Sequence, residues 1–376
     1  MSDVGLRRLP TCYPQPPHGI GGWFDLPAPF RYLECAMSAT NLLELTPDEI
    51  VSFVEGLGQP AYRGRQLATW IYVKGVGDFA AMSDLPRELR EKLSAEAVVA
   101  PPTLHDRLVS RDGSAKLILR LGDGQMVQTV VMPDRDRLTL CVSTQVGCGY
   151  GCSFCLTGTM GLLRNLTAGE IVGQVWAARA SLDPGARLTH VVFMGMGEPL
   201  ANYAATVKAL RILIAPLGFG FSPRRITVST VGLVGGLERL ARENLRVNLA
   251  ISLHAATDEV RSQLMPVNRG WGLDDLLAAC RRFPLAVRQR MTFEYTLLDQ
   301  VNDSPEDAKR LVRRLRGLRA KVNLIPFNEW PGSSFRRPPP ERILAFQRAL
   351  LDAGLLATIR WSKGEDVGAA CGQLAS

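Results

Sequence analysis

The sequence predicts an α/β protein whose main body is an open or partial (β/α)6 barrel. From about residue 134 onward, strand-like runs alternate with segments of helical periodicity, which is typical of parallel strands joined by helical crossovers. Six such units are too few to close an eight-fold barrel, and in this architecture functional groups gather at the carboxyl ends of the strands. The six runs are TLCVST, THVVFMG, RITVST, VNLAISLH, RMTFEYTLL and KVNLIPF.

Three segments precede this core of residues 134–376. Residues 1–38 are rich in proline and lack periodicity, which predicts a Pro-rich extension. Residues 39–102 predict a small helical domain, because Thr46 and Pro47 form a helix start before apolar residues at helical spacing. Residues 103–133 alternate apolar and polar residues around an Asp-Gly pair, which predicts a β-hairpin link between the two domains.

Composition excludes several classes of protein. The chain is 46% hydrophobic and 21% charged, as ordinary globular proteins are. It has no apolar run of the roughly 18–20 residues that a membrane helix needs, and its N-terminus does not resemble a signal peptide, so we expect a cytoplasmic protein with no membrane partner. Lys and Arg number 44 against 36 Asp and Glu, a net charge of +8 that suits a polyanionic partner but does not establish one.

Three cysteines crowd into one predicted loop, directly after the first strand of the barrel. Cys148, Cys152 and Cys155 have the spacing C-x3-C-x2-C. A structural zinc site needs a fourth ligand, and no histidine stands nearby in a zinc-binding pattern. A disulfide would leave one thiol unpaired. A four-iron cluster held by three cysteines keeps one iron open for a ligand, so we favour iron–sulfur over zinc or buried structural cysteines.

The triplet resembles the signature of radical S-adenosylmethionine enzymes, and the surrounding blocks narrow the resemblance. From about residue 41 onward the chain resembles the 23S rRNA adenine-C2 methyltransferase (RlmN) family. The blocks that carry this resemblance are LCVSTQVGCGYGCSFC, RNLTAGEIVGQVW, VVFMGMGEPL, RRITVSTVG, LAISLHA, NLIPFN and AACGQLA. It implies a radical-SAM barrel, a [4Fe-4S] cluster on the triplet and two S-adenosylmethionine molecules per turnover.

The resemblance also implies the residues of the site. Those expected to bind S-adenosylmethionine follow the predicted strands: Gly197, Glu198, Ser229, Ser252, Leu253, His254 and Asn328. Taken alone, Ser229 and His254 would be routine structural residues. Cys371 is expected to carry a methyl group as methyl-cysteine and to form a transient protein–RNA crosslink, which Cys141 then resolves as a disulfide. Without the resemblance, either thiol could be a buried small hydrophobe.

One position departs from the family pattern. Family members usually carry a glutamate, proposed as the base that removes the C2 proton, where this chain has Gln128 in the block VQTV. An amide cannot accept a proton near neutral pH, so we do not expect Gln128 to be catalytic. Asp134, Asp136 or solvent are the candidate substitutes.

The expected partners follow from the resemblance and from the basic residues. They are 23S rRNA, with tRNA (the adenosine 3′ to the anticodon) as a further substrate, a flavodoxin-like one-electron donor and a disulfide reductant, and the protein is expected to be a monomer. In the helical domain, cations and aromatic side chains suit RNA contact: Arg63, Arg65, Trp70 and Tyr72. The alternatives are a C8-specific adenosine methyltransferase, a radical enzyme without methyl transfer, or a non-catalytic zinc-binding RNA-binding protein.

Overall fold

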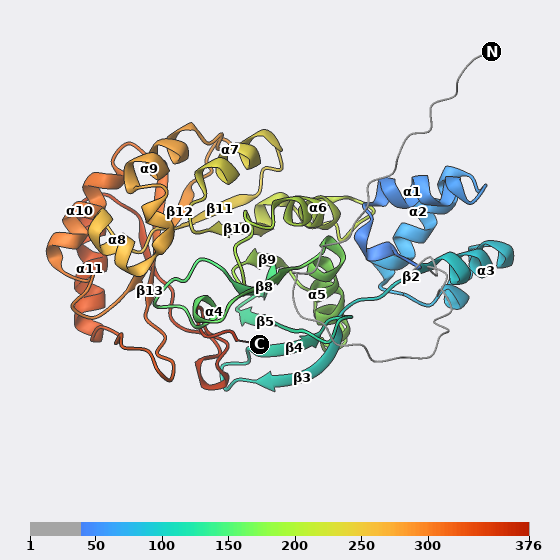
Figure 1. The fold of residues 1–376 in the computed structure, drawn as a ribbon, viewed down its shortest axis with the longest axis horizontal. Coiled ribbons are helices and arrows are strands. Elements are labelled where there is room, and N and C mark those ends of the chain that lie inside the picture. The colour runs from blue at the N-terminus through green and yellow to red at the C-terminus, as the bar shows by residue number, and fades with distance from the viewer. Residues whose placement is uncertain (1–38, 376) are drawn as a thin grey trace, which may run out of the picture. The chain divides into compact units, whose positions relative to one another are not determined.

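The computed structural model describes residues 39–375, and the Pro-rich extension expected over 1–38 lies outside this range. A ten-stranded sheet organises these residues, in the order β14-β13-β12-β11-β10-β9-β6-β5-β4-β3 (Figure 1). Within 39–375, none of the helices combines the length and the apolar composition needed to cross a membrane.

Seven consecutive strands of this sheet are parallel. The six predicted strands are all present, and each pairs in parallel with the next, so the predicted open α/β barrel is confirmed. The seventh, β14, was not predicted because only three residues form it and it pairs with β13 alone. The strands are β6 (Arg137–Cys141), β9 (His190–Phe193), β10 (Ile226–Thr230), β11 (Asn248–Ser252), β12 (Met291–Leu297), β13 (Ala320–Pro326) and β14 (Ala357–Ile359).

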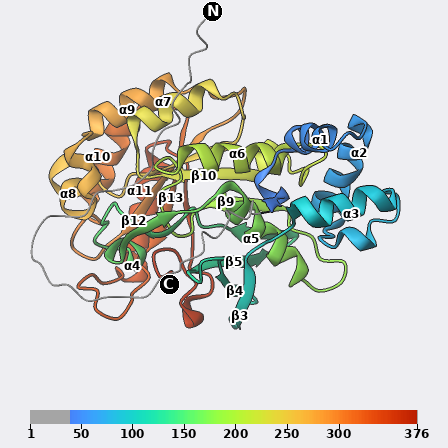
Figure 2. The ribbon, with the colours of Figure 1, turned by 45° about the vertical axis from the view of Figure 1, so that its right-hand side comes forward.

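Helices connect these strands and form an outer layer along the sheet (Figures 1 and 2). The predicted capping box at Thr167 and Glu170 starts α5, and Ser304 with Asp307 starts α10 in the same way. The helices are α5 (Ala168–Ala180), α6 (Tyr203–Ile214), α7 (Val234–Arg242), α8 (Asp258–Leu264), α9 (Leu273–Arg282), α10 (Pro305–Leu315) and α11 (Pro340–Asp352). Short 3-10 turns lie at Pro223–Arg225, Pro266–Arg269 and Glu365–Val367.

The N-terminal helices pack around Tyr72, which is fully buried. Its hydroxyl donates to the carbonyls of Leu42 (3.1 Å) and Leu45 (2.5 Å), so the expectation that Tyr72 contacts RNA is wrong. The Arg179 guanidinium of α5 donates to the Tyr72 carbonyl at 2.6 Å. The elements are β1 (Thr40–Asn41), α1 (Pro47–Gly56), α2 (Ala61–Ala68), α3 (Arg87–Glu96) and β2 (Ala97–Val98), with 3-10 turns at Leu42–Glu44 and Phe79–Ala81 and a π-helical turn at Thr69–Lys74.

The strands expected as a hairpin link extend the barrel sheet itself. β3 (Thr103–Val109), β4 (Ala115–Arg120) and β5 (Met126–Asp134) are antiparallel, and β5 pairs with β6. A separate small hairpin, β7 (Gln145–Cys148) with β8 (Gly161–Asn165), encloses the cysteine triplet and the short helix α4 (Leu156–Thr159). This hairpin replaces the simple loop that was expected after the first barrel strand.

One buried side chain joins α5 to the segment that leads into the triplet. Gln174 is fully buried; its Oε1 accepts from the Ser143 amide and its Nε2 donates to the Ser143 carbonyl, each at 2.8 Å. Ser143 lies between β6 and β7, so Gln174 fixes the path of the chain from the barrel to the cysteines.

Replacing Gln174 with methionine should lower the free energy of unfolding by about 2–4 kcal/mol. The variant keeps most of the side-chain volume but leaves the buried N–H and C=O of Ser143 without partners. Urea denaturation followed by circular dichroism measures this loss. The exposed Gln125→Met is the matched control, and an equal effect of the two substitutions would contradict the role of Gln174.

Candidate active site

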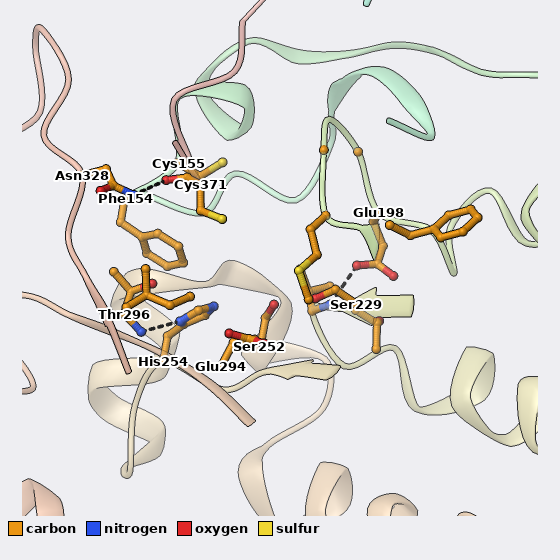
Figure 3. Close-up of a pocket in the computed structure, with 18 of the residues that line it drawn as sticks. Phe154, Cys155, Glu198, Ser229, Ser252, His254, Glu294, Thr296, Asn328 and Cys371 are labelled. Atoms are coloured by element: carbon orange, nitrogen blue, oxygen red, sulfur yellow. Dashed lines mark hydrogen bonds between the residues drawn. The ribbon is translucent and has the colours of Figure 1, made fainter. Parts of the chain in front are cut away.

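A cavity of about 150 Å³ lies at the carboxyl ends of the parallel strands. In Figure 3, Cys155 and Cys371 lie together on one side of it, with Ser252, His254 and Glu294 on the other. The structure therefore gathers residues that are far apart in the sequence. The predicted site residues that line the cavity are Cys155, Gly197, Glu198, Ser229, Ser252, His254, Asn328 and Cys371.

The triplet is held in a compact turn by glycines. Gly147 has φ +76°, and a Cβ there would lie 2.0 Å from the Gly161 carbonyl oxygen of the paired strand. At Gly158 a Cβ would lie 2.9 Å from the Cys152 carbonyl oxygen, so only glycine lets α4 close over the loop. The amide of Cys155 donates to the Cys152 carbonyl at 3.0 Å.

The three thiols form a donor set that fits an iron–sulfur cluster. Burial raises the pKa of Cys148 to about 11, and burial together with the Cys155 and Cys148 thiols raises the pKa of Cys152 still further. Ionising all three of these thiols requires a cationic group that they bind in common, and soft sulfur ligands suit iron. Among residues 39–375, no three Cys, His, Asp or Glu side chains converge on a single-ion position.

Gly197 and Glu198 follow β9 and form one wall of the cavity. Gly197 has φ +93°, and a Cβ there would lie 2.4 Å from the Cβ of Gln145. Glu198 is 2% exposed, and its two oxygens accept from the amides of Leu200 (2.9 Å) and Val231 (2.8 Å). Burial nevertheless raises the pKa of Glu198 to about 7. The carboxylate is thus fixed in orientation, and Glu198 lines the cavity.

His254 presents a single defined nitrogen to the cavity. Its backbone is left-handed, with φ 56°, and its Nδ1 accepts from the Thr296 amide at 2.9 Å. Burial, with a contribution from Arg261, lowers the pKa of His254 to about 3. The ring is therefore neutral with its proton on Nε2, which makes it a hydrogen-bond donor. The neighbouring Leu253 is fully buried and does not line the cavity.

Arg261 of α8 holds this turn in place, and the sequence analysis did not identify it. Its guanidinium donates to the carbonyls of Val231 (2.7 Å), Leu253 (3.1 Å) and Ser252 (3.2 Å). Arg261 is 1% exposed, and burial lowers its pKa to about 10. One side chain therefore fixes the ends of both β10 and β11. The local sequence of α8, DEVRSQL, is mostly polar and gave no signal that this arginine is buried.

Glu294 and Arg360 also line the cavity and were missed. Glu294 is 3% exposed; its Oε1 accepts from Asn323 at 3.0 Å, while its Oε2 has no partner among the described residues. Burial raises the pKa of Glu294. A glutamate in the middle of the otherwise apolar run MTFEYTL was a signal for it, whereas Arg360 follows β14, which was not predicted.

Cys371 and Cys141 line a second, smaller cavity together. Cys371 borders both cavities, and so does Arg360. The nearby Cys371 thiol raises the pKa of Arg360, and burial followed by the Cys371 thiol raises the pKa of Cys141 to about 12. All six cysteines of residues 39–375 are free. The structure thus brings together two thiols that are far apart in the sequence.

Asn328 lies between these two cavities and is heavily bonded to the protein. Its Nδ2 donates to the Cys371 carbonyl at 3.0 Å, and its Oδ1 accepts from Arg337 at 3.2 Å and from Ser362. Its expected contact with the cofactor stays a prediction. Asp134 and Asp136 lie at the exposed β5–β6 turn and line neither cavity, so the structure does not support them as substitute bases.

The basic residues are partly neutralised by neighbouring carboxylates. On α10, Arg313 pairs with Glu306 at 3.2 Å, and Arg314 pairs with Asp274. In the helical domain, the Lys74 ammonium lies 3.3 Å from the centre of the Trp70 ring. Cationic and aromatic surface therefore remains in the N-terminal helices, where an RNA contact was expected.

The comparisons with known proteins agree with this geometry. Residues 40–99 match the ribosomal RNA large subunit methyltransferase N-terminal domain, and residues 142–312 match the radical SAM superfamily. A dual-specificity RNA methyltransferase RlmN from Syntrophobacter fumaroxidans is 49% identical over 90% of this chain and 98% of its own length. The RlmN of Syntrophotalea carbinolica is 51% identical over 89% of each.

A solved structure is similar over the same range. The crystal structure of a radical SAM methyltransferase from Sphaerobacter thermophilus matches with a TM-score of 0.85 and 49% identity, covering 89% of this chain and 99% of that one. These similarities extend from the N-terminal helices through the barrel. The chain therefore belongs to the RlmN family of dual-specificity RNA methyltransferases.

Proposed function

We propose that this protein is a radical S-adenosylmethionine methyltransferase that methylates C2 of an adenosine in 23S rRNA. The observation that carries the proposal is the placement of Cys371 beside Cys155 in one cavity at the strand ends. A backbone contact joins the two regions, because the Leu156 amide donates to the Gly372 carbonyl at 2.8 Å. A thiol in that position can accept a methyl group from a cofactor bound between the strand ends and the triplet.

Cys148, Cys152 and Cys155 would hold a [4Fe-4S] cluster, which when bound supplies the electron that starts radical chemistry from S-adenosylmethionine. The chain's own polar groups would orient the cofactor. Glu198 would accept hydrogen bonds from the amino group of S-adenosylmethionine. The Nε2–H of His254 and the hydroxyls of Ser229 and Ser252, which line the same cavity, would bond the oxygen and nitrogen atoms of the cofactor. Gly197, which has no side chain, would let the cofactor come close to the backbone.

Cys371 would carry the methyl group between cofactor and RNA. Its thiolate attacks the methyl carbon of the sulfonium, so that an S–C bond forms, the old one breaks and S-adenosylhomocysteine leaves. The Arg360 guanidinium lines both cavities together with this thiol. In the crosslinked state the carbon of that methyl group, after losing a hydrogen atom to radical chemistry, joins the Cys371 sulfur to C2 of the adenine. Cys141 then gives up its proton and attacks the Cys371 sulfur, so that an S–S bond forms as the S–C bond breaks. The released carbon takes up a proton and becomes the methyl group of the product, while C2 loses its own proton. An external dithiol then reduces this disulfide.

The remaining partners follow from this chemistry. We propose that the protein also acts on tRNA at the adenosine 3′ to the anticodon, takes electrons from a flavodoxin-like donor, and works as a cytoplasmic monomer. The target base must leave its stack to reach a thiol that lines a cavity, so a loop adenosine suits the site better than one in a duplex.

The test of the function is nucleoside analysis of rRNA from a deletion strain with and without the gene. Complementation should restore 2-methyladenosine in 23S rRNA. Appearance of 8-methyladenosine instead would support the C8-specific alternative. Restoration by a variant without the three triplet cysteines would support a role independent of iron and overturn the proposal.

Replacing Cys371 with alanine should abolish RNA methylation, a loss of at least a hundredfold, because no other thiol of residues 39–375 borders both cavities. Mass spectrometry of the digested protein should find the methyl group on the Cys371 peptide of the wild type. Cys280→Ala is the matched control, since Cys280 is a buried free thiol of α9 away from the site. Equal RNA methylation by Cys371→Ala and the control would contradict the assignment.

Replacing Glu198 with glutamine should weaken S-adenosylmethionine binding by about tenfold or more. The glutamine side chain lacks the negative charge that attracts the amino group of the cofactor. Its NH2 group also faces one of the two backbone N–H groups that donate to the carboxylate in the wild type. Equilibrium dialysis with the cluster-loaded protein measures the dissociation constant. Glu238→Gln, at the exposed ion pair with Arg282, should leave binding unchanged. Unchanged binding in Glu198→Gln would exclude Glu198 from the cofactor site.

A further inference from the structure

The thiol of Cys371 lies in a loop, residues 364–375, that other parts of the fold hold at both ends. At its start, the β3–β4 turn provides the contacts. The Asp112 carboxylate accepts from the Gly364 amide at 3.0 Å, and the Ser110 hydroxyl donates to the Asp366 carboxylate at 2.5 Å. These bonds fix the point at which the loop leaves the barrel.

The end of the loop is held by two other elements. From α4, the Leu156 amide donates to the Gly372 carbonyl at 2.8 Å, and the Thr157 hydroxyl donates to the Leu374 carbonyl at 2.5 Å. From β5, the Gln128 amide bonds twice to Ala375: its Nε2 donates to the carbonyl, and its Oε1 accepts from the backbone N–H at 3.4 Å. Cys371 lies between the two anchored ends.

The chemistry of the Gln128 side chain suits this contact. A primary amide carries a donor and an acceptor side by side, so it can match both backbone groups of one residue, which a carboxylate or an apolar side chain cannot do. Gln128 is 7% exposed, so an unmatched backbone group facing it would be largely desolvated. Gln128 lines neither cavity, and therefore has no direct contact with a molecule bound there.

We propose that Gln128 is a positioning residue for Cys371, whose amide anchors the end of the loop 364–375 and so keeps the thiol at the junction of the two cavities. The expected effect of Gln128 on methyl transfer rests on the proposed function of Cys371. The anchoring of the loop by Gln128 does not depend on that function. This role explains Gln128 at a position where the sequence pattern predicted no catalytic residue.

Hydrogen–deuterium exchange of the cluster-loaded protein under anaerobic conditions tests the anchor directly. Gln128→Glu keeps the shape but sets a carboxylate oxygen against the Ala375 carbonyl, and Gln128→Met removes both bonds. Each should speed exchange in the peptide of residues 364–375 on the order of tenfold, without changing exchange in β3 and β4. Gln125→Glu makes the same substitution at the exposed β4–β5 turn, and it should leave hydrogen exchange unchanged both in residues 364–375 and in β3 and β4. Unchanged exchange in both Gln128 variants would overturn the anchor.

Kinetics of Cys371 methylation test the positioning role. Because Gln128 does not border the cofactor cavity, both variants should lower kcat by about tenfold while KM for S-adenosylmethionine stays unchanged. Faster exchange with an unchanged kcat, or a raised KM, would overturn positioning. If even the wild-type protein does not methylate Cys371, the proposed function fails, while the exchange measurement still decides whether Gln128 anchors the loop.

Discussion

The active site depends on the return of the C-terminal segment to the loop that follows β6. No local pattern brings Cys371 to the triplet; backbone and side-chain bonds do, from Leu156 to Gly372, from Thr157 to Leu374 and from Asn328 to Cys371. Without this contact, the strand ends would still form a cofactor cavity beside three thiols, as a radical enzyme requires. The cavity would then lack a further thiol, beyond the triplet, that could carry a methyl group. The contact is therefore what a methyl-transferring enzyme needs in addition to the parts that other radical enzymes share.

A second constraint keeps the cavity open and polar among apolar strands. Arg261 satisfies three strand-end carbonyls at once, and Gln174 satisfies both backbone groups of Ser143. Each is a buried polar side chain whose bonding groups match the backbone around it, so the chain can end its strands inside the protein without leaving unpaired groups. The backbone around the cofactor cavity is then set before any ligand binds.

Much of this arrangement could be predicted from the sequence, because it rests on local patterns. The spacing of Cys148, Cys152 and Cys155, and the polar residues at the strand ends, follow from short motifs and from the period of the strands. What could not be predicted depends on pairing between distant segments. β14 is too short to have a pattern, and Tyr72 is buried where its hydroxyl bonds to the backbone carbonyls of Leu42 and Leu45, far from it in the sequence. Arg261 and Arg360 look like surface residues in the sequence, and only the tertiary structure buries Arg261 and places Arg360 at the two cavities.

The most direct test of the central claim is an anaerobic crystal structure of the cluster-loaded protein with S-adenosylmethionine bound. We expect the cofactor in the cavity bordered by Glu198, His254 and Cys371, between the strand ends and the triplet, with the Cys371 side chain facing it. A cofactor bound elsewhere, or a Cys371 loop lying away from the triplet in the occupied enzyme, would contradict the account.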